Sequence, residues 1–192
     1  MVAVAACGEM NSGVRSDGSA RPAKPSCPKA WQAGWQALAD RIQAPVYCPS
    51  WITPPLTGEI HGPWNNIYSV DRRNGSYLVG FTWYEVASGE VHVNLRGYPG
   101  RTTIPRCPGD APGQTVPCFA DASGQKRIGG CEVTVYTANQ GADKWHIAYV
   151  WRRGDNLYVL SEHVATPYTY RRVAAFLDRM MRSLVLVAPR GA

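Results

Sequence analysis

The sequence predicts an α+β fold: an antiparallel sheet of about six strands, with an N-terminal and a C-terminal helix packed on one face of it. Three observations predict this fold. Two segments, one near each end of the domain, carry apolar residues at helical spacing. Segments between them alternate apolar and polar residues, as half-buried strands do. Turn signals join neighbouring segments, which favours antiparallel hairpins.

The first helix is predicted over residues 30–43. Its apolar side chains fall at i, i+4, i+7 and i+11 and so form one stripe: Trp31, Trp35, Leu38 and Ile42. Pro28 precedes this segment and Pro45 follows it. Because proline limits a helix at both ends, the two residues bracket the prediction.

A three-stranded meander is predicted next, over residues 67–71, 77–85 and 90–98. Asn74-Gly75 lies between the first two strands, and this dipeptide is a strong signal for a tight hairpin. The second and third strands each place apolar residues at alternating positions: Tyr77, Val79, Phe81, Trp83, Val91, Val93 and Leu95. The meander is therefore expected to bury one face.

Residues 99–130 interrupt the alternation with five prolines and two cysteines, Cys107 and Cys118. A loop of this length without structure of its own is unusual inside a compact domain. A Cys107–Cys118 disulfide is therefore expected to hold it.

Three further strands and a closing helix complete the domain. The strands are predicted over residues 131–137, 145–152 and 156–164, the last two joined at Gly154-Asp155. The helix is expected to begin at Pro167, because proline suits the first helical position. Its apolar stripe is the clearest in the chain: Val173, Phe176, Leu177, Met180 and Leu184.

The composition fits one folded domain over residues 27–187. Of the 192 residues 45% are hydrophobic, and seven Trp and ten Tyr are present, which supplies a core and excludes bulk disorder. The net charge is +6, but the arginines are scattered and no basic run of five or more residues exists. Nucleic acid is therefore not an expected partner.

The six cysteines predict disulfides in an oxidising compartment rather than a metal site. None forms a Cys-x-x-Cys pair, and their wide spacing does not suit a zinc ribbon. Cys27 and Cys48 flank the first helix and can bridge only if the chain turns back sharply at Pro45. With Cys7 lipidated, one cysteine of the remaining five is left unpaired or bonded to another chain, and Cys131 has no assigned partner.

The first residues resemble a bacterial lipobox. Small residues precede Cys7 in Val4-Ala5-Ala6-Cys7-Gly8, so residues 1–7 are expected to be the remnant of a lipoprotein signal, with diacylglycerol on the Cys7 thiol anchoring the protein to a membrane. Only six residues precede Cys7, and an ordinary buried or disulfide-bonded cysteine is the alternative. Residues 8–26 have the composition of a flexible tether with a span of roughly 25 Å.

Two stretches resemble a known family. One runs from Pro45-Val46-Tyr47-Cys48-Pro49-Ser50-Trp51-Ile52 into residues 77–98, and the other from Ile147-Ala148-Tyr149-Val150-Trp151 through Tyr158-Val159-Leu160 to Ser183-Leu184. They are similar to extracytoplasmic domains of unknown function in Gram-positive, actinobacterial lipoproteins and anti-sigma-factor-like membrane proteins. The resemblance implies a sheet-and-helix domain like the lipoprotein carriers, whose curved sheet can hold an acyl chain, and it implies no catalytic residues.

No catalytic, metal or cofactor motif is present. The four histidines, His61, His92, His146 and His163, stand apart in sequence, without paired His at metal-binding spacing. Ser161-Glu162-His163 is the one local group that suggests a hydrolase, yet adjacent strand residues point to opposite faces, which opposes a direct relay.

Six aromatic residues are candidates for a ligand groove on the open face of the sheet: Trp64, Trp83, Tyr84, Trp145, Trp151 and Tyr158. Ordinary core packing is the alternative for the same residues. The function predicted is a membrane-anchored or secreted extracytoplasmic binding module, non-catalytic, for an envelope lipid, glycan or protein partner. A secreted hydrolase with an unrecognised His and carboxylate site is the alternative.

Overall fold

The structure is mostly β, which corrects the predicted α+β class. The computed structural model describes residues 24–87, 89–109, 111–120, 122–139 and 145–191. These contain eleven strands in three antiparallel sheets and two short helices. The prediction missed five strands because four of them are only three or four residues long, and β7 (Ala122–Ile128) is polar and largely exposed, so that it has no apolar alternation.

The main sheet has seven strands in the order β2-β3-β4-β10-β9-β8-β7. The bounds of the first six are β2 (Asn65–Val70), β3 (Tyr77–Glu85), β4 (Gly89–Tyr98), β10 (Asn156–Val164), β9 (Trp145–Arg153) and β8 (Cys131–Asn139). The two predicted meanders are thus joined edge to edge where β4 pairs with β10, for example at Leu95 and Leu160. Both strands are buried in the centre of the sheet.

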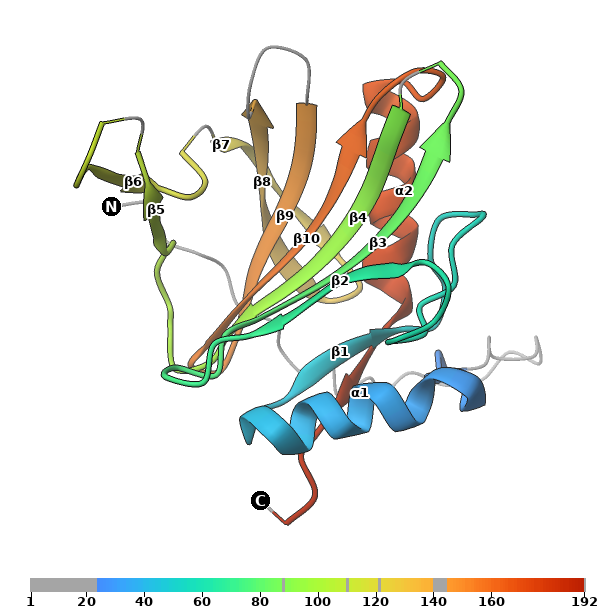
Figure 1. Cartoon of the computed structure of the whole chain (residues 1–192), viewed down its shortest axis with the longest axis vertical. Helices are drawn as coiled ribbons and strands as arrows, with labels where there is room; N and C mark the ends of the chain where they lie inside the picture. The colour runs from blue at the N-terminus through green and yellow to red at the C-terminus, as the bar shows by residue number, and fades with distance from the viewer. Residues whose placement is uncertain (1–23, 88, 110, 121, 140–144, 192) are drawn as a thin grey trace, which may run out of the picture.

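Helix α2 (Tyr170–Ser183) covers one face of the main sheet, as Figure 1 shows. Its stripe of Val173, Leu177 and Met180 is fully buried there. The helix begins three residues later than predicted, because Thr169 rather than Thr166 caps it, its side chain accepting a hydrogen bond from the backbone N–H of Arg172. It ends before Leu184, which belongs to the next strand.

Helix α1 (Lys29–Ile42) does not share that face, so the prediction of two helices on one face of the main sheet is wrong. It packs instead on a separate two-stranded sheet, β1 (Val46–Pro49) and β11 (Leu184–Val187), below the main sheet in Figure 1. This small sheet joins an early and a late segment of the described chain, because Val46 pairs with Val187 and Pro49 with Leu184. Trp35 anchors α1, its indole N–H donating to the Gly58 carbonyl at 2.8 Å.

Both expected disulfides are present. The Cys27–Cys48 bridge, with 5.7 Å between Cα atoms, ties the start of α1 to β1. The Cys107–Cys118 bridge closes a small hairpin of β5 (Arg106–Pro108) and β6 (Thr115–Pro117), so residues 99–130 are not a structureless loop. These bridges indicate an oxidising, extracytoplasmic compartment.

The fifth described cysteine, Cys131, is also disulfide-bonded. The expectation of an unpaired thiol therefore does not apply to it. Cys7 and the tether of residues 8–23 lie outside the described residues. Among the helices that the structure describes, none is long and apolar enough to cross a membrane.

Replacing Cys27 and Cys48 together by serine is expected to lower the free energy of unfolding by about 3 kcal/mol, the loop-closure entropy of a bridge of this span. Urea denaturation followed by tryptophan fluorescence measures it. The matched double variant at Cys107 and Cys118, which frees only the small hairpin, should leave the packing of α1 on β1 intact. Equal hydrogen exchange at α1 in both double variants would contradict the anchoring role of the first bridge.

Candidate functional site

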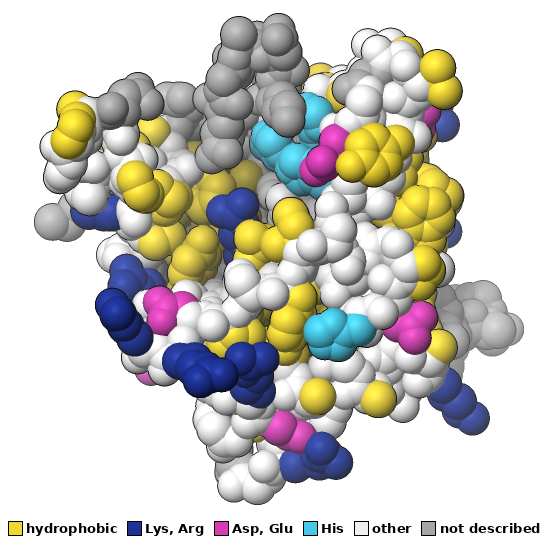
Figure 2. All heavy atoms as spheres, in the orientation of Figure 1, with side chains coloured by type: hydrophobic (Ala, Val, Ile, Leu, Met, Phe, Trp, Pro, Cys, Tyr) yellow, Lys and Arg dark blue, Asp and Glu magenta, His cyan; other side chains and the backbone are white. Residues whose placement is uncertain are grey.

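Three histidines that lie far apart in sequence form one row on the face of the main sheet opposite α2. His146 on β9 pairs directly with His163 on β10, and the β10–β4 register places His92 on the other side of His163. The three ring centroids are 4.8 to 5.4 Å apart. Figure 2 shows these side chains gathered near the top of this face, beside an acidic side chain.

Each of the three rings takes part in a hydrogen bond. His163 Nδ1 lies 3.0 Å from the Glu90 backbone oxygen, so this nitrogen carries the proton and donates it. His92 Nε2 and His146 Nε2 are 2.7 Å apart, and the Glu90 carboxylate lies 3.5 Å from His92 Nδ1. The Glu90 carboxylate, His92 and His146 therefore lie in contact with one another at this end of the sheet.

The row does not form the hydrolase arrangement that the sequence suggested. Glu162 points to the opposite face from His163, and its carboxylate accepts a hydrogen bond from the Thr53 hydroxyl at 3.2 Å instead. His61 is exposed, packs at a tilted angle against the ring of Tyr68 and lies apart from the row. Within the described ranges no group of three or more His, Cys, Asp or Glu is arranged to hold a metal ion.

Glu162 itself is a buried carboxyl of the core. It is 1% exposed, and burial raises its pKa from 4.5 to about 8, with the Thr53 hydrogen bond opposing the rise. The group is therefore neutral in the folded protein over most of the physiological pH range.

The predicted aromatic groove is not formed by the residues proposed for it. Trp83, Trp151 and Tyr158 are 3%, 1% and 2% exposed in the core beneath α2, where Trp151 stacks on Tyr158. Such residues are not accessible to a ligand. Tyr84 is 77% exposed, Trp64 is half-buried, and the side chain of Trp145 lies outside the described residues.

A different cluster of aromatic residues is exposed on the outer side of α2. It consists of Trp51, from the segment after β1, with Tyr168, Arg172, Phe176 and Arg179, and is called the arginine–aromatic face below. The Arg179 guanidinium carbon lies 4.0 Å from the centre of the Trp51 ring. Arg172 lies 5.3 Å from the ring of Tyr168 and 5.6 Å from that of Phe176.

The rings of this face support one another as well. Phe176 packs between Tyr168 and Trp51, with centroid distances of 5.9 and 6.2 Å. One carboxylate, Glu85, lies at its end and accepts hydrogen bonds from Tyr168 Oη and Trp83 Nε1. The face therefore presents two exposed cations on half-buried aromatic rings.

Sequence reasoning missed this face. Arg172 and Arg179 are seven residues apart and therefore fall on one side of the helix, which a helical wheel could have shown. Phe176 was assigned to the core stripe, and Tyr168 precedes the helix. Trp51 could not have been found in this way, because only the folded chain brings it to α2.

No family model matches the chain, and neither a curated protein nor a solved structure is significantly similar to it. The resemblance to extracytoplasmic lipoprotein domains therefore stays a prediction.

Glu162→Gln is expected to remove a pH dependence of stability. Because the pKa of Glu162 is raised in the folded state, the protonated carboxyl stabilises the folded protein. This contribution to the free energy of unfolding is complete below about pH 4.5 and is lost as the pH rises towards 8. Over this window the wild-type free energy of unfolding should fall by up to ~1.4 kcal/mol per pH unit more than that of the variant. Urea titrations from pH 5 to 9 measure the difference. Glu132→Gln, at an exposed glutamate, should leave the slope unchanged, and equal slopes in wild type and Glu162→Gln would contradict the burial effect.

Proposed function

We propose that this protein is a non-catalytic, extracytoplasmic binding module that docks on the anionic phospholipid headgroups of the cell membrane through the arginine–aromatic face. The observation that carries the proposal is the stacking of two exposed guanidinium groups on half-buried rings at the outer side of α2.

This arrangement suits a phosphate-bearing surface. A guanidinium that stacks on a ring keeps the N–H groups at its edge available, and these donors match two phosphate oxygens at once. Aromatic side chains favour the headgroup region of a bilayer, where one part of the ring is apolar and the other contacts water. Each arginine near an anionic surface contributes about 1 kcal/mol.

A glycan is the less suitable partner for this face. Sugar binding by aromatic residues uses an uncovered ring in a concave site. Here Arg179 covers the ring of Trp51, and Arg172 lies over those of Tyr168 and Phe176. The face is also the outer side of a helix rather than a groove.

A lipid anchor at Cys7 would complement such a face. Because Cys131 is disulfide-bonded and the other four described cysteines pair with one another, this anchor requires Cys131 to bond to a second chain. Two acyl chains hold a protein on a bilayer, and a tether with a span of roughly 25 Å keeps α2 close to the headgroups at a high effective concentration. A weak electrostatic contact is then sufficient to orient the domain.

Reversing both charges in Arg172→Glu/Arg179→Glu is expected to reduce binding to vesicles of 30% phosphatidylglycerol in phosphatidylcholine at least tenfold, because two attractive charges become repulsive. Co-sedimentation of the secreted, non-acylated chain at low salt measures it, and wild-type binding should fall as salt is added.

The matched control is Arg72→Glu/Arg73→Glu, in the exposed turn between β2 and β3. It changes the net charge from +6 to +2 by the same four units, since each reversal removes two. It should retain most of the binding. Equal losses in the two double variants would mean that only the overall charge matters, and this outcome would contradict the proposed face.

Intact and peptide mass spectrometry of the membrane fraction tests the anchor separately. A mature chain that begins at Cys7 and carries the mass of diacylglycerol is expected. A tryptic peptide that links Cys7 by a disulfide to another cysteine would exclude acylation of this thiol, without affecting the vesicle experiment.

A further inference from the structure

Strand β11 has one edge without a partner strand among the described residues, since the small sheet consists of β1 and β11 alone. The register shows which backbone groups lie on that edge. Ser50 N–H donates to the Ser183 carbonyl, so this pair is hydrogen-bonded, and in an antiparallel ladder such pairs alternate. The N–H and C=O groups of Val185 and Val187 therefore point toward β1, whereas those of Leu186 and the C=O of Leu184 point outward. The N–H of Leu184, the C-cap of α2, donates within that helix.

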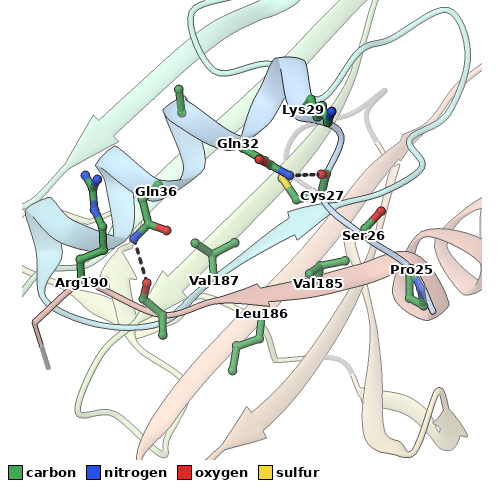
Figure 3. A pocket seen from close by; sticks show the side chains of 12 residues that line it. Pro25, Ser26, Cys27, Lys29, Gln32, Gln36, Val185, Leu186, Val187 and Arg190 are labelled. Carbon is green, nitrogen blue, oxygen red and sulfur yellow. Dashed lines mark hydrogen bonds between the residues drawn. The ribbon is translucent and has the colours of Figure 1, made fainter.

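An open groove of about 760 Å³ lies beside β11, as Figure 3 shows. Its floor is the apolar run from Val185 to Val187, and its walls are α1 and the segment of Pro25, Ser26 and Cys27. At the far end Gln36 Nε2 donates to the outward carbonyl of Ala188 at 2.9 Å. This side-chain bond ends the unpaired edge, which leaves Leu184 and Leu186 as its exposed part.

The charge of the groove is positive and lies at one end. Two cations line it, Lys29 and Arg190, and no carboxylate does. Arg190 is neutralised by Asp40 of α1, with an Nη2–Oδ2 distance of 2.6 Å. Within the described part of the chain Lys29 forms no ion pair, and it is the first residue of α1.

Helix α1 and β11 run in the same direction, because Gln36 meets Ala188 and Asp40 meets Arg190 further along both elements. Lys29 consequently lies near the start of β11. A strand added antiparallel to β11 would run the opposite way and end there.

We propose that this groove binds an extended peptide, which adds antiparallel to β11 as a third strand and places its C-terminal carboxylate near Lys29. Apolar side chains at alternating positions of the peptide would lie on Val185 and Val187. The outward groups of Leu184 and Leu186 supply one donor, the Leu186 N–H, and two acceptors for its backbone. Charge complementarity favours a peptide terminus over a second copy of the chain. Antiparallel pairing of two β11 edges would place Lys29 of one copy near the neutral Arg190–Asp40 pair of the other, whereas a peptide terminus supplies a carboxylate.

The probe is a fluorescein-labelled hexapeptide of alternating threonine and valine with an unmodified C-terminal carboxylate, titrated with the full chain and followed by fluorescence anisotropy. The same peptide with a C-terminal amide should bind at least threefold more weakly. N-methylation of alternate residues, which removes donors from one edge of the peptide, should weaken binding at least tenfold in one register and little in the other.

Two protein variants complete the test. Lys29→Glu should abolish the difference between the carboxylate and amide peptides, whereas Arg72→Glu, an equal charge change on the β2–β3 turn, should preserve it. Amide hydrogen exchange at Leu186 should be fast in the protein alone and slowed by the peptide, a readout that does not depend on the stability of a variant.

Three results would overturn the proposal. Equal affinity for both N-methylated registers would exclude pairing with β11. Protection of the Leu186 amide without peptide in a monomeric protein would mean that a segment of this chain already covers the edge. Concentration-dependent dimerisation in sedimentation, lost in Leu186→Pro, would assign the edge to a second copy.

Discussion

The pairing of β4 with β10 is the constraint on which the rest of the structure depends. It joins two meanders through strands that lie more than fifty residues apart in sequence, and its six residue pairs run from Leu157–Tyr98 to Glu162–Val93. Both strands are largely buried, so water cannot reach their backbone N–H and C=O groups and replace the partner strand in hydrogen bonding. The seven-stranded sheet, the floor under α2 and the histidine row all follow from this ladder.

A second, smaller set of contacts fixes the positions of α1, β1 and β11. The β1–β11 pair and the Cys27–Cys48 bridge hold α1 away from the main sheet. Two distinct surfaces result, because α2 is left with its outer side uncovered and β11 with one edge uncovered. The first surface is charged and aromatic and faces outward, whereas the second is a groove with an apolar floor. Their different chemistry supports two different partners, a lipid surface and an extended peptide.

Local patterns predicted much of the fold. Both helices and the six long strands were located within a few residues, since burial of one side of an element leaves a periodic trace in sequence. The same patterns did not reveal β7, whose residues are exposed on both faces, or β11, whose Leu184 was assigned to the preceding helix. The candidate sites were harder to predict from local sequence patterns than the fold was. His92 and His163 are separated by about seventy residues, and Trp51 and Arg179 by more than one hundred, so their contacts have no local signal.

The sequence by itself determined the periodic faces of the long elements, the turns between neighbouring strands and the cysteine spacings that permit both bridges. Only the tertiary structure decided what covers each face. It placed Trp83, Trp151 and Tyr158 in the core and Trp51 on the surface, and it moved α1 to a sheet of its own. The physical reason is that periodicity records how apolar one side of an element is, whereas the partner of that side is chosen by packing and strand pairing over the whole chain.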